Sequence, residues 1–152
     1  MSRCNGCTLC CHLLDVEALN KKAGEQCIHC KDKFGCLIHS IRPLECRAYE
    51  CIWYTNKHLP DELRPDICGV LFELANNHKT AIALVDPKRP DAWKEKEPKR
   101  VIRSLVNSGR AVIVNLPVGK KFILPEGMTK LDALNDVFNI LIQTRKIKNG
   151  ST

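Results

Sequence analysis

The distribution of cysteine constrains this chain more than any other feature of its sequence. All ten cysteines of the 152 residues lie between Cys4 and Cys68, and the 84 residues that follow contain none. The N-terminus shows no basic segment followed by an apolar stretch, so we expect a cytoplasmic protein. In a reducing cytosol, dense cysteines serve more often as metal ligands than as disulfides. The sequence therefore predicts a metal-binding half, although ten cysteines in a secreted chain would also suit five disulfides.

The spacing of the cysteines favours metal binding. Two successive CxxC steps join Cys4, Cys7 and Cys10, and a third step joins Cys27 to Cys30. A gap of two residues lets two thiolates converge on one cation at about the 2.3 Å metal–sulfur distance. Neighbouring side chains usually point apart, so we expect Cys10 and Cys11 to serve different metals, or one of them to be a spare. Eight thiolates saturate two tetrahedral sites or one polynuclear cluster, so the stoichiometry permits one metal or two.

The same residues carry a resemblance to a known family. The matching segments are CNGCTLCC from Cys4 to Cys11, then Cys27, GCLIH at 35–39, RPLECR at 42–47 and CIW at 51–53. This ordered combination resembles the bacterial and archaeal CxxCxxCC cysteine-cluster proteins, described as a zinc- or iron-chelating domain. The resemblance covers residues 4–53 and nominates as metal ligands Cys4, Cys7, Cys10, Cys11, Cys27, Cys36, Cys46 and Cys51. It leaves out Cys30 and Cys68, and His39 stands where the family usually has tyrosine.

Zinc and iron are the two candidates for the metal. Zinc accepts four thiolates in a closed structural site and suits a loop-rich region without a core. The first CxxC steps also match the first three positions of the bacterial ferredoxin run, but the fourth cysteine, after three residues and before proline, is absent. We therefore expect one or two zinc ions in a structural role, with an iron–sulfur redox, sensor or enzyme-accessory protein as the alternative. His12 and His29, each beside a cysteine, and His39 stay open as nitrogen ligands.

Other chemistry has little support in the sequence. No carboxylate or nucleophile accompanies a histidine at a recognisable spacing, and no glycine-rich phosphate-binding motif is present, so an enzyme is not indicated. Arg42, Arg47 and Lys57 lie near the cysteines, where they would offset the surplus negative charge of a thiolate site or merely fix turns. Trp53 and Tyr54 would shield the site from water, although packing is the more common role of such a pair.

The distribution of charged residues divides the chain at the same place as the distribution of cysteines. Residues 1–68 hold nine basic and nine acidic side chains, whereas residues 69–152 hold fifteen and eight, which gives the second half a net charge of +7. We expect a cysteine-rich metal-binding lobe over residues 1–68 and a basic lobe over residues 69–152. The basic lobe is a candidate adaptor for an acidic protein or nucleic acid, with Trp93 as a base-stacking residue, but a charge this modest is more often that of a lysine-rich soluble surface. No apolar run approaches the roughly 18 residues of a membrane helix.

The hydrophobic pattern predicts an α+β fold. The cysteine-rich lobe is mostly irregular, with one helix over 15–23 that Asp15 caps and Gly24 ends. In the basic lobe we expect strands over 69–74 and 80–86 joined as a hairpin, with helix as the alternative for 69–74, and a helix from about Pro98 to just before Gly109. Strands over 111–116 and 121–124 form a second hairpin, and a helix begins at Thr129 and Asp132 and ends near Lys148. This order predicts a small antiparallel sheet covered by two helices, with the irregular, metal-stapled N-terminal lobe packed on it.

Overall fold

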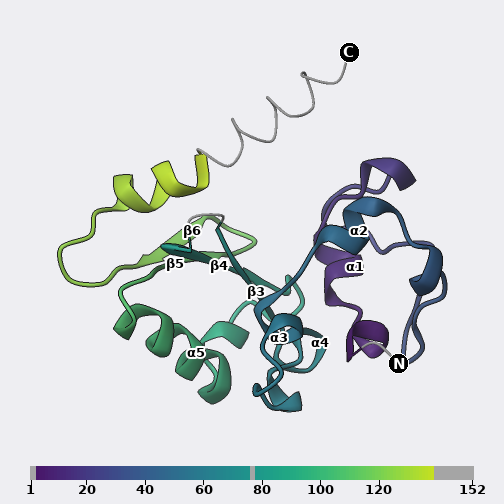
Figure 1. Cartoon of the computed structure of the whole chain (residues 1–152), viewed down its shortest axis with the longest axis horizontal. Coiled ribbons are helices and arrows are strands. Elements are labelled where there is room, and N and C mark those ends of the chain that lie inside the picture. The colour runs from purple at the N-terminus through teal and green to yellow at the C-terminus, as the bar shows by residue number, and fades with distance from the viewer. Residues whose placement is uncertain (1–2, 76–77, 139–152) are drawn as a thin grey trace.

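A computed structural model describes residues 3–75 and 78–138 of the chain (Figure 1). The fold is α+β, as predicted, with a loop-rich N-terminal region beside a four-stranded sheet. In this part of the chain, no helix is both long enough and apolar enough to cross a membrane.

The N-terminal region contains only short elements. These are η1 Arg3–Gly6, α1 Leu9–Leu13, η2 Glu17–Leu19, β1 Cys30–Lys31, β2 Gly35–Cys36, η3 His39–Ile41, α2 Leu44–Ala48, α3 Ile52–Thr55, η4 Asp61–Leu63 and α4 Pro65–Cys68. The helix predicted over 15–23 is wrong, since only the single turn η2 forms there. It stops because Asn20 adopts a left-handed φ of 50° and because Val16 and Lys21 exchange backbone hydrogen bonds of 2.9 and 3.1 Å. Asp15 caps nothing, since Val16 occupies the N-cap position.

The main sheet contains the four predicted strands. They are β3 Val70–Leu74, β4 Thr80–Val85, β5 Ala111–Asn115 and β6 Lys120–Ile123, side by side in that order. The pairs β3–β4 and β5–β6 are antiparallel, as predicted. The prediction of an entirely antiparallel sheet is wrong, because β4 and β5 run parallel. Parallel neighbours need a crossover connection, and the chain makes it through η5 Ala92–Lys94 and α5 Lys96–Asn107.

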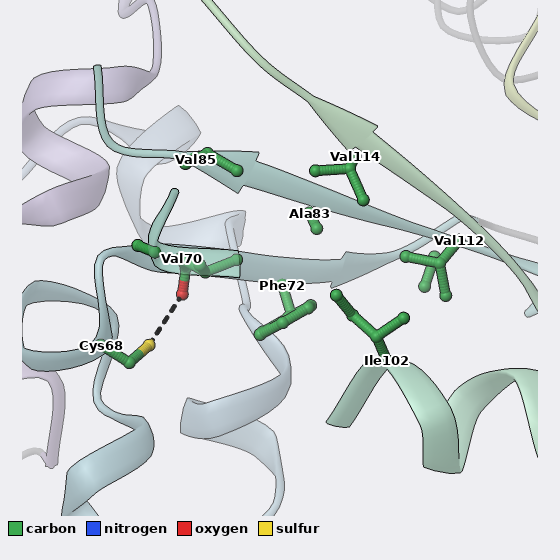
Figure 2. Packing of buried hydrophobic residues seen from close by; sticks show 10 residues of the cluster. Cys68, Val70, Phe72, Ala83, Val85, Ile102, Val112 and Val114 are labelled. Atoms are coloured by element: carbon green, nitrogen blue, oxygen red, sulfur yellow. Dashed lines mark hydrogen bonds between the residues drawn. The ribbon is translucent and has the colours of Figure 1, made fainter. Parts of the chain in front are cut away.

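One face of the sheet packs against α5. This helix was predicted from Pro98 and begins slightly earlier, with Pro98 in its first turn, where the missing backbone N–H costs nothing. Figure 2 shows Ile102 of α5 directed toward Phe72 and Val112, in a cluster that also contains Ala83 and Val114. The alternation of strand residues explains the cluster, because every second side chain of β3, β4 and β5 points to this face.

The other face carries a second helix, at residues 130–138. Ala133 and Val137 pack there against Ala111 and Ile113 of β5. The predicted start is confirmed, since the Asp132 N–H donates to Thr129 Oγ1 (3.2 Å) and the Thr129 N–H donates to the Asp132 carboxylate (2.8 Å). The rest of the predicted helix, over 139–148, lies outside the described residues. The two helices therefore lie on opposite faces of the sheet, as Figure 1 shows.

The N-terminal region is joined to the sheet along the edge strand β3. A cluster of buried side chains there contains Leu9, Cys51, Trp53, Leu63 and Leu71. Trp53 is 4% exposed, and its indole N–H donates to the Pro60 carbonyl (3.1 Å). The cluster holds α1 and α3 against β3, so the cysteines on and beside these helices have a fixed support.

Candidate metal centre

A cavity of about 230 Å³ lies within the N-terminal region, between α1, α2 and the loops around them. Its lining includes all eight cysteines nominated as ligands, namely Cys4, Cys7, Cys10, Cys11, Cys27, Cys36, Cys46 and Cys51. Neither Cys30 nor Cys68 is among the lining residues. Residues far apart in the sequence are thus brought to one place.

Two tight turns build the first part of this site. The Cys7 N–H donates to the Cys4 carbonyl (3.1 Å), and the Cys30 N–H donates to the Cys27 carbonyl (3.0 Å). Each turn spans one CxxC step, the local geometry that lets two sulfurs face one ion. The Cys27 N–H also donates to the Cys11 carbonyl (3.1 Å), so the second turn is attached to α1.

The remaining cysteines come from later elements. Cys36 ends β2, where it lies opposite Cys30 in the small hairpin. Cys46 lies within α2, which begins after Pro43, and Cys51 occupies the N-cap position of α3. The lining cysteines therefore come from η1 and the residue after it, α1, the turn at 27–30, β2, α2 and the start of α3.

All ten cysteines are present as thiols. Across residues 3–75 and 78–138, no group of three or more cysteine, histidine, aspartate or glutamate side chains stands close enough together to hold a metal ion. The thiols surround the cavity rather than meet at one point. Their chemistry nevertheless fits a thiophilic metal, because a set of sulfur donors prefers zinc or iron–sulfur centres over hard cations.

Burial governs the acidity of these thiols. It raises the pKa of Cys7 to about 12 and that of Cys30 to about 12. The pKa of Cys11 is also raised, first because of its hydrogen bond with the Cys10 thiol and then by burial. Near neutral pH such thiols keep their protons unless a cation lies beside them, so a metal ion would have to displace the protons as it binds.

Two basic side chains line the cavity. Arg42, one of the three predicted cations, acts to lower the pKa of Cys4 and Cys36, although burial, the larger effect, raises both. The other two predicted cations, Arg47 and Lys57, are exposed and do not line the cavity. Of the three predicted cations, only Arg42 therefore lies where it would offset the negative charge of thiolates in the cavity.

Lys21 is the second basic side chain, and the sequence reasoning missed it. It is only 7% exposed, and its ammonium donates to the carbonyls of Leu14, Lys22 (3.1 Å) and His12 (3.4 Å). Its charge opposes the rise in the pKa of Cys11. No local pattern signals such a residue, because a lysine in a polar segment usually lies on the surface.

The three histidines left open as ligands differ in position. His39 lines the cavity, contacts the Arg42 guanidinium, and has a pKa lowered by burial and then by Arg42. His12 and His29 are not lining residues. A neutral His39 would be able to offer nitrogen to a cation, but its contact with Arg42 already occupies Nε2.

Cys68 belongs to the hydrophobic core and not to the cavity. Its thiol donates to the Val70 carbonyl (3.3 Å), as Figure 2 shows, and lies 3.6 Å from that of Leu63. Burial raises its pKa to about 11. A buried protonated thiol of this kind behaves as a small apolar side chain.

No protein-family model matches this chain, and no curated protein or solved structure is similar enough to it to count as a match. The resemblance to the CxxCxxCC cysteine-cluster family therefore stays a prediction.

The binding of an acidic protein or nucleic acid by the basic lobe also stays a prediction. Trp93, the candidate base-stacking residue, has the ammonium groups of Lys94 and Lys121 at 5.6 and 5.0 Å from its ring centroid.

Proposed function

We propose that this chain is a metal-binding protein whose N-terminal cysteines hold one or two zinc ions in a structural role. The observation that carries the proposal is the gathering of all eight candidate thiols around one cavity. These thiols come from segments that sequence spacing alone does not bring together. A set of thiolate donors of this kind suits zinc in closed four-coordinate sites.

The poor core of the N-terminal region supports a structural role for the metal. Between Glu17 and Glu50 only Lys21, Cys27 and Gly35 are buried. A segment with so little buried apolar surface cannot recover the conformational entropy lost on folding. Metal binding contributes its free energy directly to folding in such segments.

Elemental analysis tests the proposal. The full chain, purified without air, is expected to contain one or two zinc ions per molecule, and Cys27→Ser is expected to lower that number. Cys68→Ser is the matched control, because Cys68 is buried outside the cavity and its loss should leave the zinc content unchanged. Folded protein with its thiols intact and no bound metal would contradict the proposal.

An iron–sulfur cluster is the second candidate, and the size of the cavity favours it. About 230 Å³ of continuous space exceeds what one bare ion occupies and leaves room for bridging sulfide. Anaerobically purified protein would then be brown, with visible absorption that bleaches on oxidation. Colourless protein containing stoichiometric zinc would rule out the cluster.

A further inference from the structure

A groove of about 210 Å³ opens beside the turn between β5 and β6. One wall comes from residues 90–94, which include η5, and the other comes from residues 116–118 of the turn. No cysteine is among its lining residues. The groove is therefore separate from the candidate metal centre, and an inference about it does not rest on the proposed function.

Both walls of this groove are fixed to the hydrophobic core. Ala92 of η5 is 2% exposed and belongs to the core cluster between the sheet and α5, and Trp93 and Leu116 pack against the same cluster. In the turn, the Leu116 N–H donates to the Gly119 carbonyl (3.0 Å), which closes the loop that carries Val118. The groove is thus preformed, so a ligand would not have to order it on binding.

The lining of the groove is mostly apolar. It is formed largely by Pro90, Trp93, Leu116, Pro117 and Val118. Val118 is 91% exposed, the highest value among the large apolar side chains of residues 3–75 and 78–138. Such a groove gains free energy when an apolar side chain fills it and displaces water. Its volume is below the roughly 300 Å³ at which typical small-molecule sites begin, so it suits a single side chain better than a cofactor.

Lysine side chains lie around the groove. The ammonium groups of Lys121 and Lys94 lie 5.0 and 5.6 Å from the centroid of the Trp93 ring. Lys94 is paired with Asp91 (2.6 Å), whereas in the described part of the chain no carboxylate forms an ion pair with Lys121 or with its exposed neighbour Lys120. The groove therefore has surplus positive charge on its β6 side.

These features favour a peptide over a nucleic acid as the ligand. Single strands bind by stacking successive bases on several aromatic rings. Trp93 is the only aromatic side chain among the described lining residues, and the others around it are mostly aliphatic or proline. An aliphatic side chain fits that lining, and carboxylates beside it would meet Lys120 and Lys121. Complementary charge of this kind selects the partner that binds.

We propose that this groove is a docking site for an acidic segment of another protein. One aliphatic side chain of the segment lies against Trp93 and Val118, and the carboxylates that flank it pair with Lys120 and Lys121. Of the two partners predicted for the basic lobe, the groove thus selects the acidic protein. The ion pairs lie at the surface, so binding weakens as salt concentration rises.

Nuclear magnetic resonance of the isotope-labelled full chain tests the inference. The probe is a short synthetic peptide with a central leucine between aspartates, added to millimolar concentration. The indole N–H of Trp93 and the amides of Val118 and Lys121 are expected to shift together, whereas the indole of buried Trp53 keeps its position. Peptides with alanine for leucine, or asparagine for aspartate, should bind more weakly. No shift at Trp93, or equal binding of the three peptides, would overturn the inference.

Two matched pairs of variants test the groove itself. Val118→Asp is expected to weaken peptide binding about tenfold or more, because a like charge replaces an apolar contact. Leu131→Asp, at another exposed apolar residue of the same lobe, should leave binding unchanged. Lys121→Gln is expected to weaken binding roughly 2- to 5-fold, the range of one exposed ion pair. Lys130→Gln is its control, since the Lys130 ammonium lies 5.6 Å from the Phe122 ring on the other face of the sheet.

Two outcomes of these measurements point to other ligands. Equal weakening by Lys121→Gln and Lys130→Gln would mean that the peptide responds to net charge alone, which would overturn the inference. A single-stranded oligothymidylate is expected to leave the Trp93 indole resonance unchanged. A Trp93 shift with this oligonucleotide and none with the peptide would assign the groove to nucleic acid instead. The metal content of the chain enters none of these outcomes, so they are distinct from a failure of the proposed function.

Discussion

Single residues show how closely the chain is packed where the N-terminal region meets the sheet. Gly69 ends α4 with a φ of +72° and leads directly into β3. A Cβ at this position would lie 2.9 Å from the Cβ of Ala92 in η5. Both the backbone angle and the close approach therefore require glycine.

Gly69→Ala is expected to destabilise the protein by roughly 2–4 kcal/mol, because left-handed strain and a steric clash add together. The midpoint of chemical denaturation measures the loss. Gly109→Ala is the matched control, since Gly109 has a φ of +83° but no atom within 4 Å of the added Cβ. It should show the backbone strain alone, and equal losses in the two variants would contradict the clash at Ala92.

Lys21→Met is expected to lower the stability of the N-terminal region by about 1–3 kcal/mol, because buried carbonyls lose their donor. Lys22→Met is the control, since the neighbouring Lys22 side chain is exposed. Denaturation of metal-loaded protein, followed by a probe attached in the N-terminal region, measures both. Indistinguishable effects of the two substitutions would show that the carbonyl contacts of Lys21 add no stability.

The candidate site was predictable partly from local spacing and partly from the family resemblance, which nominated Cys36, Cys46 and Cys51. The CxxC steps are local, and the cavity lining contains every nominated cysteine. The pairing of Cys30 with Cys36 was not predictable, because the strands of their hairpin, Cys30–Lys31 and Gly35–Cys36, are too short to show periodicity. Lys21 gains its importance from carbonyls that fold around it, and no sequence pattern encodes those contacts.

Among the elements, hydrophobic periodicity predicted the bounds of those strands whose own residues alternate between apolar and polar. All four strands of the main sheet end within one residue of the predicted bounds, because alternation is visible within each strand. The parallel pairing of β4 with β5 was missed, since it depends on where α5 returns the chain and not on either strand. The helix predicted over 15–23 does not form, because backbone hydrogen bonds between Val16 and Lys21 override the weak helical preference of this segment.

The helix at 130–138 supports a pH-dependent prediction. Hydrogen bonds from Thr129 hold the pKa of Asp132 below its ordinary value. The carboxylate therefore stabilises the helix start above the pKa of the unfolded chain, and this contribution is lost as pH falls through the lower, folded pKa. The Thr129 amide chemical shift is expected to follow this titration in wild type and to lose it in Asp132→Asn. An inflection at the ordinary aspartate value of about 3.9 would contradict the capping interaction.

The whole molecule places most of its apolar core in the sheet and most of its cysteines outside that core, with Cys51 and Cys68 as exceptions. The largest core cluster lies between β3, β4, β5 and α5, and a smaller one lies between β5 and the helix at 130–138. The two predicted lobes meet most closely in the cluster where Leu71 of β3 packs with Leu9, Cys51 and Trp53. Stability contributed by apolar burial is therefore concentrated in the sheet and at its β3 edge, whereas the segment from Glu17 to Glu50 contributes little of it.

Removal of the metal is accordingly expected to unfold one part of the molecule and leave the other intact. After treatment with a strong chelator under anaerobic, reducing conditions, amide hydrogens between Glu17 and Glu50 should exchange rapidly, because their few structured turns lose their only cross-links. Amides of β4 and β5 should keep their protection, since these strands lie at the centre of the sheet and their side chains are buried on both faces. Added zinc should restore protection between Glu17 and Glu50, which excludes irreversible damage. Unchanged exchange in that segment would mean that metal does not hold it together, and the structural role would then have to be abandoned even if zinc binds.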